Sequence, residues 1–304
     1  MAYLRNLREV QRFEHLDLLA RQVVEGFIVG LHKSPFHGFS VEFAEHRLYN
    51  PGESARTIDW KVFARTDRLY TKRFEEETNL RARIVIDGSS SMDYPSADAP
   101  VNKKRFSVLC AAALMVLLDR QRDACGLTIF DEAVRVHTRS GSSRTHQNLL
   151  FSHLDQLLDR DVERVGTDAV SSLHAIAERI PRRSLVILFS DMVQREDPDA
   201  VFDALQHFKY NKHEVMLFHV TDHATELELE FENRPHVFVD METGEEVRVH
   251  PHQVRERYIE HSHRFFHQLK LRCGQYGIDL IEADIARDFH HVLLPYLLKR
   301  KRLM

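Results

Sequence analysis

The chain has 304 residues, and its 42 lysines and arginines stand against 46 aspartates and glutamates, giving a formal net charge of −4 at pH 7. A protein that binds nucleic acid through its phosphates needs a basic face, so this charge balance argues against that class. Hydrophobic residues make up 43% of the chain and charged residues 29%, a mixture that can bury a sizeable core and that excludes a disordered chain.

The cysteines and the apolar stretches indicate the cellular compartment of such a protein. Cys110, Cys125 and Cys273 are widely separated and form no C-x-x-C pair, so we expect neither a disulfide framework nor a thiolate zinc site. The most apolar early stretch, residues 23–31, is interrupted by Glu25 and falls short of the roughly 20 residues that cross a bilayer. We therefore expect a cytoplasmic protein without a membrane span.

The first predicted element is a helix over residues 13–30. Its apolar side chains recur at steps of three and four, at Leu16, Leu19, Val23 and Phe27. This spacing places them on one face of a helix. Gly30, followed closely by Ser34-Pro35, predicts that the helix ends near residue 30.

Residues 36–78 predict extended segments joined by polar turns. The sequence alternates over residues 39–43, turns at Asn50-Pro51-Gly52 and has strand character over residues 69–74. Trp60 and Phe63 are interpreted as packing anchors rather than as a ligand site. We assign residues 1–79 to an N-terminal helix with an extended, β-rich segment, and residues 80–304 to the domain that follows.

From residue 80 onwards, predicted strands alternate with predicted helices. The strands are expected over residues 82–87, 126–130, 133–138, 185–191, 215–221 and 278–283. The helices are expected over residues 103–122, 145–158, 168–180, 198–207, 251–276 and 289–298. This alternation is typical of an α/β fold with a mainly parallel, Rossmann-like sheet and helices on both faces. Residues 236–250, centred on Thr243-Gly244, predict an inserted hairpin.

Three polar segments are expected at one edge of this sheet. Asp87, Ser89 and Ser91 follow the first strand, Thr167 precedes a helix, and Asp191 ends a later strand. Open α/β sheets bind ligands outside the carboxyl ends of their strands. Hydroxyl and carboxylate oxygens are hard ligands that suit Mg²⁺, with Mn²⁺ as an alternative.

In the predicted site, Ser89, Ser91 and Thr167 offer oxygens to the metal, while Asp87 and Asp191 bind it directly or orient its waters. One open position would accept a carboxylate from a partner protein. The alternative is that these residues only form turns and helix caps, Thr167 being followed by Asp168 at a helix start.

The same residues resemble a known motif. D-x-S-x-S at Asp87, Ser89 and Ser91, with the later Thr167 and Asp191, is similar to the metal-ion-dependent adhesion site of von Willebrand factor A (vWA) domains. The upstream strings Ser34-Pro-Phe-His-Gly38, Arg47-Leu-Tyr49 and Arg56-Thr-Ile-Asp-Trp60 resemble the bacterial domain-of-unknown-function family fifty-eight. This resemblance implies a vWA-like interaction or assembly module, working with the MoxR-type AAA+ ATPases beside which the family is often encoded.

An enzymatic alternative uses Asp87 as the nucleophile of a Mg²⁺-dependent hydrolase or phosphatase. The aspartyl-phosphate phosphatases carry D-x-D, whereas Ser89 takes the place of the second acid here. Glycine-rich phosphate-binding motifs and a G-x-S-x-G elbow are missing from the sequence. His263 and His267 have zinc-compatible spacing but are interpreted as a solvated helix face. A binding module is therefore favoured over an enzyme.

Overall fold

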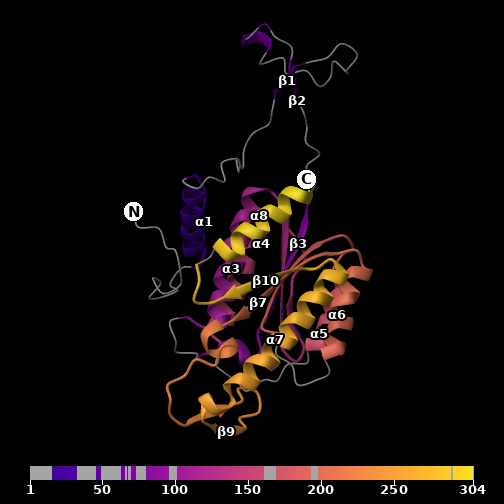
Figure 1. The fold of residues 1–304 in the computed structure, drawn as a ribbon. Helices are drawn as coiled ribbons and strands as arrows, with labels where there is room; N and C mark the ends of the chain where they lie inside the picture. The colour runs from indigo at the N-terminus through magenta and orange to yellow at the C-terminus, as the bar shows by residue number, and fades with distance from the viewer. Residues whose placement is uncertain are drawn as a thin grey trace.

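A six-stranded sheet forms the centre of the molecule (Figure 1). The computed structural model describes residues 16–32, 46–48, 63–65, 67, 70–72, 80–95, 101–160, 169–192, 198–288 and 290–303. The parallel strands are β3 (Arg81–Asp87), β4 (Ala124–Phe130), β6 (Leu185–Ser190), β7 (Glu214–Thr221) and β10 (Asp279–Asp284). The antiparallel edge strand β5 (Val134–His137) completes the order β10-β7-β6-β3-β4-β5.

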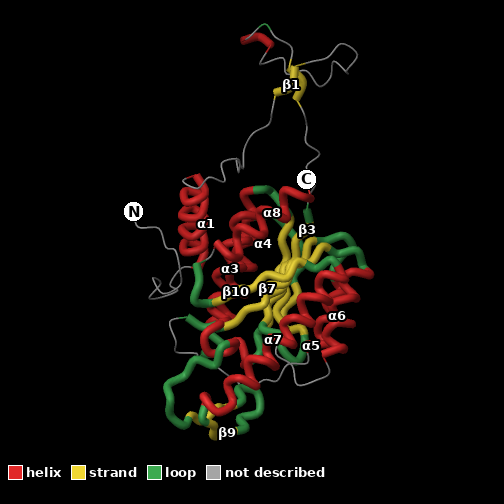
Figure 2. The backbone as a smooth tube through the Cα atoms, in the orientation of Figure 1, coloured by secondary structure: helices red, strands yellow, loops and turns green. Residues whose placement is uncertain are grey.

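Helices cover both faces of the sheet, which Figure 2 shows in yellow between two red layers. One layer contains α1 (Leu16–His32), α3 (Lys103–Arg120), α4 (Arg144–Leu158) and α8 (His290–Leu303). The other contains α5 (Ala169–Arg179), α6 (Pro198–Tyr210) and α7 (Pro251–Tyr276). The α/β fold predicted from the alternating pattern is confirmed.

Each buried strand supplies side chains to two cores. On β3, Ile84 and Ile86 pack into the core under α3, whereas Val85 faces the core under α5 and α6. Successive strand side chains point to opposite faces, so a strand buried on both sides has to be apolar throughout. Helix α3 is also buried on nearly all sides, because α1 packs on its outer surface.

The N-terminal helix presents the apolar face that the sequence predicts. Leu16, Val23 and Phe27 are buried, and Leu19 packs against the same core. The helix ends at His32, within two residues of Gly30 and before Pro35, close to where the sequence predicts.

Part of the following segment can be compared with the prediction of extended structure. Strand β1 (His46–Leu48) pairs antiparallel with β2 (Tyr70–Lys72), which confirms strand character within residues 69–74. The predicted strand at residues 39–43, the turn at Asn50-Pro51-Gly52 and Trp60 lie outside the described residues. The division of the chain at residues 79 and 80 stays a prediction.

The last helix is longer than predicted. It was expected to end at Leu298, with the basic residues 299–302 following it, but α8 contains Pro295 and runs to Leu303. Lys299 Nζ lies 2.6 Å from Glu214 Oε2 and 3.0 Å from Asp279 Oδ2. These ion pairs fix the end of α8 to the first residues of β7 and β10, which explains why the helix continues.

The inserted hairpin is confirmed. Strand β8 (His236–Val239) pairs antiparallel with β9 (Glu246–Val249), and Gly244 in the turn has φ 75°, a conformation that favours glycine. Among the described helices, none combines the length and the apolarity that a bilayer crossing requires.

Candidate functional site

The predicted site begins at the carboxyl end of β3. Asp87 is the last residue of this strand and is 1% exposed. Its Oδ1 accepts a hydrogen bond from Ser89 N at 3.0 Å, and its Oδ2 accepts one from Ser190 Oγ at 2.7 Å. Because Ser190 ends β6, which pairs with β3, the carboxyl ends of these two strands meet at Asp87.

The two predicted serine ligands lie together after Asp87. The Oγ atoms of Ser89 and Ser91 are 3.0 Å apart, because a short 3-10 helix, η3 (Ser90–Asp93), brings the second serine back towards the first. A helix of a single turn is too short to leave a periodic pattern in the sequence, so η3 could not be predicted. Asp191 follows β6 directly, next to Ser190, whereas Thr167 lies outside the described residues. The structure thus brings Asp87, Ser89, Ser91 and Asp191 to one edge.

A lysine that the sequence analysis did not select lies at the same edge. Lys103, the first residue of α3, is 1% exposed and places Nζ 2.7 Å from Asp191 Oδ2 and 2.6 Å from Glu226 Oε1. A cation at a helix N-terminus is unfavourable next to the positive end of the dipole, and the first turn of α3 has no acidic residue. This mismatch is a sequence signal, but it applies equally to Lys104 and Arg105 in the same turn and so does not single out Lys103.

Glu226 reaches the lysine from a short π-helix, η4 (His223–Leu227), after β7. Its Oε2 accepts a hydrogen bond from Asp222 N at 2.8 Å, and Tyr258 donates its hydroxyl to the Glu226 carbonyl at 2.7 Å. Nothing in the residues around Glu226 predicts this role, because the lysine that it pairs with is 123 positions away in sequence.

The charges at this edge do not balance. Burial raises the pKa of Asp87 to about 7, and the neighbouring Asp191 adds to the effect. Burial lowers the pKa of Lys103, but Asp191 and Glu226 raise it more strongly, so the net shift is upward and the ammonium is retained. Three carboxylates therefore face one ammonium, and no ion pair reaches Asp87 within the described part of the chain.

Other buried acids have cations of their own. Asp93 Oδ1 lies 2.7 Å from Lys104 Nζ, and Asp131 is paired with Arg135 and Arg160. Asp87 differs from both because it receives only neutral donors from the described residues. A buried carboxyl group that has no ion pair with a described cation, with hydroxyl oxygens close by, matches the donor chemistry of a divalent hard cation.

The donor set fits Mg²⁺ and excludes a site made of acids and imidazoles. No group of three or more His, Cys, Asp or Glu side chains in the described ranges converges as metal ligands. Asp87, Ser89, Ser91 and Asp191 are instead an oxygen set with few acids, suited to a metal that keeps several waters. His263, set aside as a zinc ligand, lies 3.8 Å from Glu228 Oε1 on an exposed helix face.

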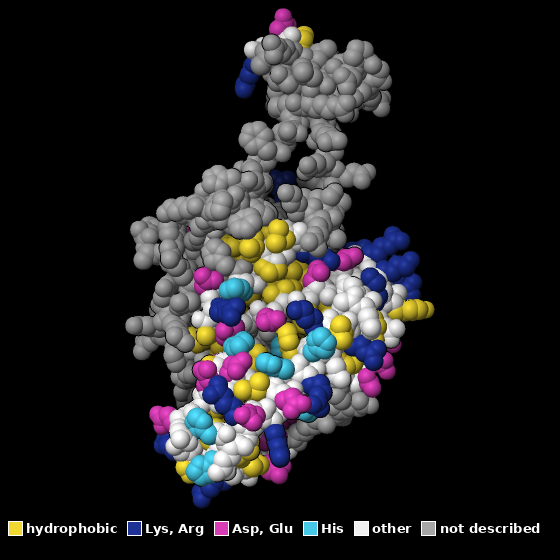
Figure 3. Space-filling model, in the orientation of Figure 1, with side chains coloured by type: hydrophobic (Ala, Val, Ile, Leu, Met, Phe, Trp, Pro, Cys, Tyr) yellow, Lys and Arg dark blue, Asp and Glu magenta, His cyan; other side chains and the backbone are white. Residues whose placement is uncertain are grey.

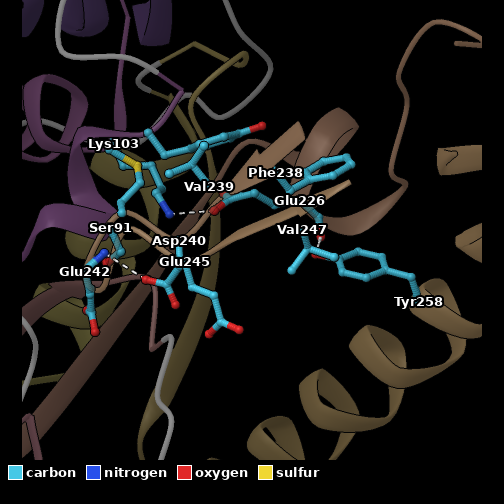
Figure 4. A pocket seen from close by; sticks show the side chains of 12 residues that line it. Ser91, Lys103, Glu226, Phe238, Val239, Asp240, Glu242, Glu245, Val247 and Tyr258 are labelled. Atoms are coloured by element: carbon cyan, nitrogen blue, oxygen red, sulfur yellow. Dashed lines mark hydrogen bonds and ion pairs between the residues drawn. The ribbon is translucent and has the colours of Figure 1, made fainter. Parts of the chain in front are cut away.

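A cleft of about 560 Å³ opens beside Ser91, between the sheet edge and the inserted hairpin. Figure 4 shows the acidic side chains of Asp240, Glu242 and Glu245 on the side of Ser91, with Phe238 and Tyr258 on the other side. We call this space the hairpin cleft. The remaining described residues that line it are Tyr94, Lys103, Glu226, Val239, Met241 and Val247.

Comparison with known proteins assigns the sequence to a family. The sequence model of the family described as "protein of unknown function DUF58" matches residues 45–266. The chain belongs to this family. It is 26% identical over 178 residues to uncharacterized proteins of Mycobacterium bovis and Mycobacterium tuberculosis, and the match covers 59% of this chain. The chain spans about half the length of the curated relatives it matches, since 55% of each is covered.

Solved structures with a similar arrangement of helices and strands include the following two. The conserved hypothetical protein BatB from Bacteroides thetaiotaomicron is 16% identical with a TM-score of 0.40, covering 67% of this chain and 90% of its own. The VWA domain of SpRpn10 is 13% identical with a TM-score of 0.40, covering 70% of this chain and 93% of its own. The chemistry of the site is therefore argued from the residues of this chain alone.

Proposed function

We propose that this DUF58 protein is a metal-ion-dependent protein-interaction module. Mg²⁺, or Mn²⁺ in its place, would be held by Asp87, Ser89 and Ser91 together with Thr167 and Asp191. The observation that supports this most directly is the buried Asp87 carboxylate, which has no ion pair with a described cation and is followed by two adjacent hydroxyls. A carboxylate that is costly to bury is retained where it holds a cation.

The surrounding residues would keep the ligands in position. Ser89 N–H and Ser190 Oγ fix the Asp87 carboxylate, and Lys103 fixes one oxygen of Asp191. The metal, when bound, would supply the positive charge that attracts a carboxylate from outside. Ser91 is the predicted ligand that borders the hairpin cleft, so an Asp or Glu of a partner protein would reach the metal beside Ser91. The charge of the bound metal would have to outweigh the repulsion from Asp240, Glu242 and Glu245, which line the same cleft.

The proposed partner is a MoxR-type AAA+ ATPase, with this chain acting as an adapter in the assembly or maturation of protein complexes. This part of the proposal rests on the family resemblance carried by residues 34–65 and by the Asp87 motif. The charge balance of the chain supports a protein partner over nucleic acid. ATP hydrolysis would belong to the partner, since the sequence has no phosphate-binding loop.

Calorimetric titration with Mg²⁺ and Mn²⁺ tests the metal site. Wild type is compared with Asp87→Ala/Ser89→Ala, and with Asp199→Ala/Ser171→Ala as a control that removes the same groups from exposed helix positions. We expect binding in the wild type and the control but not in the site variant, with thermal melts confirming that all three fold. Equal heats in the wild type and the site variant would refute the proposal.

The hydrolase alternative is disfavoured by the position of Asp87. Its side chain is 1% exposed, so a phosphoester, which is far larger than a metal ion, has no access to the carboxylate. We therefore expect no turnover of a generic phosphoester with Mg²⁺. Turnover that disappears in Asp87→Asn would favour the enzyme instead.

A further inference from the structure

A second polar surface lies at the opposite edge of the sheet. The loop of residues 181–184 leads into β6, and residues 210–213 lead into β7, so both lie at the amino ends of neighbouring parallel strands. We call these two segments the basic loop pair. They are separated from Asp87 and Ser190 by the full length of the strands.

Buried polar side chains hold the two loops together. Ser184 N donates to His213 Nδ1 at 3.3 Å, and Glu214 N donates to Ser184 O at 3.1 Å. Asn211 Nδ2 donates to the Ala177 carbonyl at 3.0 Å, which fixes the second loop to α5. The backbone of the basic loop pair is therefore preorganised, and little backbone conformational entropy would be lost there on binding.

The outer surface of this platform is basic. Arg182, Arg183, Lys212 and Tyr210 line a depression of about 500 Å³, and no carboxylate of a described residue lines it. The three cations are exposed and take part in no ion pair among the described residues, and Tyr210 is 80% exposed. Figure 3 shows lysine and arginine side chains gathered at the upper right, over the α6 side of the molecule.

The backbone also holds two of these cations in an uncommon conformation. Arg183 has φ 61° and Lys212 has φ 59°, in the left-handed region that costs a non-glycine residue free energy. Each loop thus places a charged side chain where glycine or asparagine would be less strained. Arg122, in the turn before β4, has the same conformation with φ 58°, so it is shared by the helix-to-strand turns of this sheet and fixes their course rather than indicating a ligand.

We propose that the basic loop pair binds an acidic, Asp/Glu-rich segment of a partner protein, with an apolar side chain of that segment resting on Tyr210. Arginine forks bind carboxylates in a bidentate manner, and exposed Tyr with Arg is the composition of interface centres. Nucleic acid fits less well, because the chain as a whole is acidic and three cations give few phosphate contacts. This surface would act independently of the metal site.

Fluorescence anisotropy on the full chain tests this proposal. The probes are a labelled Glu-rich peptide with one central leucine, the same peptide with Gln at every Glu position, and single-stranded oligo-dT. Arg182→Glu/Arg183→Glu is compared with Arg139→Glu/Arg248→Glu, which makes the same charge change at exposed positions elsewhere. Tyr210→Ala keeps the charge and removes the aromatic contact.

We expect the Glu peptide to bind wild type and the control, with affinity at least about tenfold lower in Arg182→Glu/Arg183→Glu. Tyr210→Ala should weaken binding without changing its salt dependence. Equal loss in the control, equal binding of the Gln peptide, or no binding to wild type would each overturn the proposal. Tighter binding of oligo-dT than of the Glu peptide would assign the surface to nucleic acid and overturn it as well.

Discussion

Lys103 shows how one side chain joins three elements. A cation in the first turn of α3 opposes the helix dipole at a cost of about 0.3–1 kcal/mol, but its ammonium contacts carboxylates from the end of β6 and from η4. Breaking a buried ion pair by removing one partner typically costs about 3–5 kcal/mol. The unfavourable helix position is therefore outweighed, and the lysine fixes the Asp191 carboxylate next to Asp87.

Asp87 has no ion pair with a described cation, so we expect its buried carboxylate to lower the stability of the metal-free protein and to support metal binding. Without metal, in a chelator at pH 8, Asp87→Asn should raise the free energy of unfolding by about 1–2 kcal/mol, because the buried charge disappears. With Mg²⁺ in excess, wild type should gain stability by mass action, and the variant should not.

Chemical denaturation with and without Mg²⁺ measures both effects. Asp93→Asn is the matched control: Asp93 is paired with Lys104, so its loss should destabilise the protein in either condition. An Asp87→Asn protein less stable than wild type in chelator would contradict the argument.

His219 predicts a pH dependence of stability. Burial lowers the pKa of His219 to about 4, below its usual 6.5, and its Nε2 lies 3.0 Å from the Asp191 carbonyl. The unfolded state binds the proton first, so the contribution of neutral His219 is complete above about pH 6.5 and is lost as pH falls towards 4. Asp87 acts oppositely, because its raised pKa favours the folded state at lower pH.

The difference between wild type and His219→Gln isolates this effect. Between pH 7 and pH 4, the stability of wild type relative to the variant should fall by up to about 3 kcal/mol, measured by urea unfolding at several pH values. The same substitution at exposed His267 should leave the wild-type curve unchanged. Parallel curves for wild type and His219→Gln would show that the imidazole is not buried as described.

At the scale of helices and strands, the prediction from sequence succeeded where burial sets the pattern. All six sheet strands and the 236–250 hairpin lie within a few residues of their predicted positions. The inner strands β3, β4, β6 and β7 are buried on both faces and read as apolar runs. The single-turn helices η3 and η4 were not predicted, since they depend on local hydrogen bonds rather than on periodicity. The predicted end of α8 was wrong, because Lys299 pairs with residues of two distant strands and the local sequence gives no sign of such contacts.

The side chain of Arg83 on β3 packs against Gly126 on the neighbouring strand β4. The buried Arg83 guanidinium donates to the carbonyls of Leu127 and Thr138, and a Cβ at Gly126 would lie 2.6 Å from Arg83 Nη1. Gly126→Ala should therefore destabilise the protein by about 2 kcal/mol through overpacking.

A double-mutant cycle tests this contact. Combining Gly126→Ala with Arg83→Met should cost less than the sum of the two single changes, because the clash is removed. Gly274→Ala is the control: no atom lies within 4 Å of its added Cβ, and alanine should stabilise α7 by about 1 kcal/mol. Additive losses at positions 83 and 126 would exclude the proposed contact.

At the scale of the whole molecule, sequence order was enough to bring Asp87 to Ser190 and Asp191. Parallel strands end at the same edge, so motifs after two such strands are expected to meet, and the structure confirms this for the described residues. The pairing of Lys103 with Asp191, 88 positions apart, could not be predicted, because no local pattern reports a contact between a helix start and a distant strand end. The predicted ligand Thr167 lies outside the described residues, so its place in the site stays a prediction.

The inserted hairpin should be separable from the folding of the two cores. Val237, Val239 and Val247 are each about half exposed, and β8 pairs with β9 alone in the described sheets. Replacing residues 236–249 by a short Gly-Ser linker should therefore preserve one cooperative thermal transition, with a small change in stability of about 1 kcal/mol.

Circular dichroism melts and Mg²⁺ titration of this deletion measure the outcome. Retained metal binding with a normal melt would show that neither the fold nor the metal site needs the hairpin. A broad, non-cooperative melt would show instead that the hairpin supports the fold.

Strand β6 also sets a fixed span. Its six residues, Leu185–Ser190, rise about 3.3 Å each and so separate the basic loop pair from the Asp87 edge by about 20 Å. Two ligands could then occupy the two ends at once without touching each other. If both belong to one assembly, capture at one end raises the local concentration at the other, and two weak contacts yield a long-lived complex through avidity.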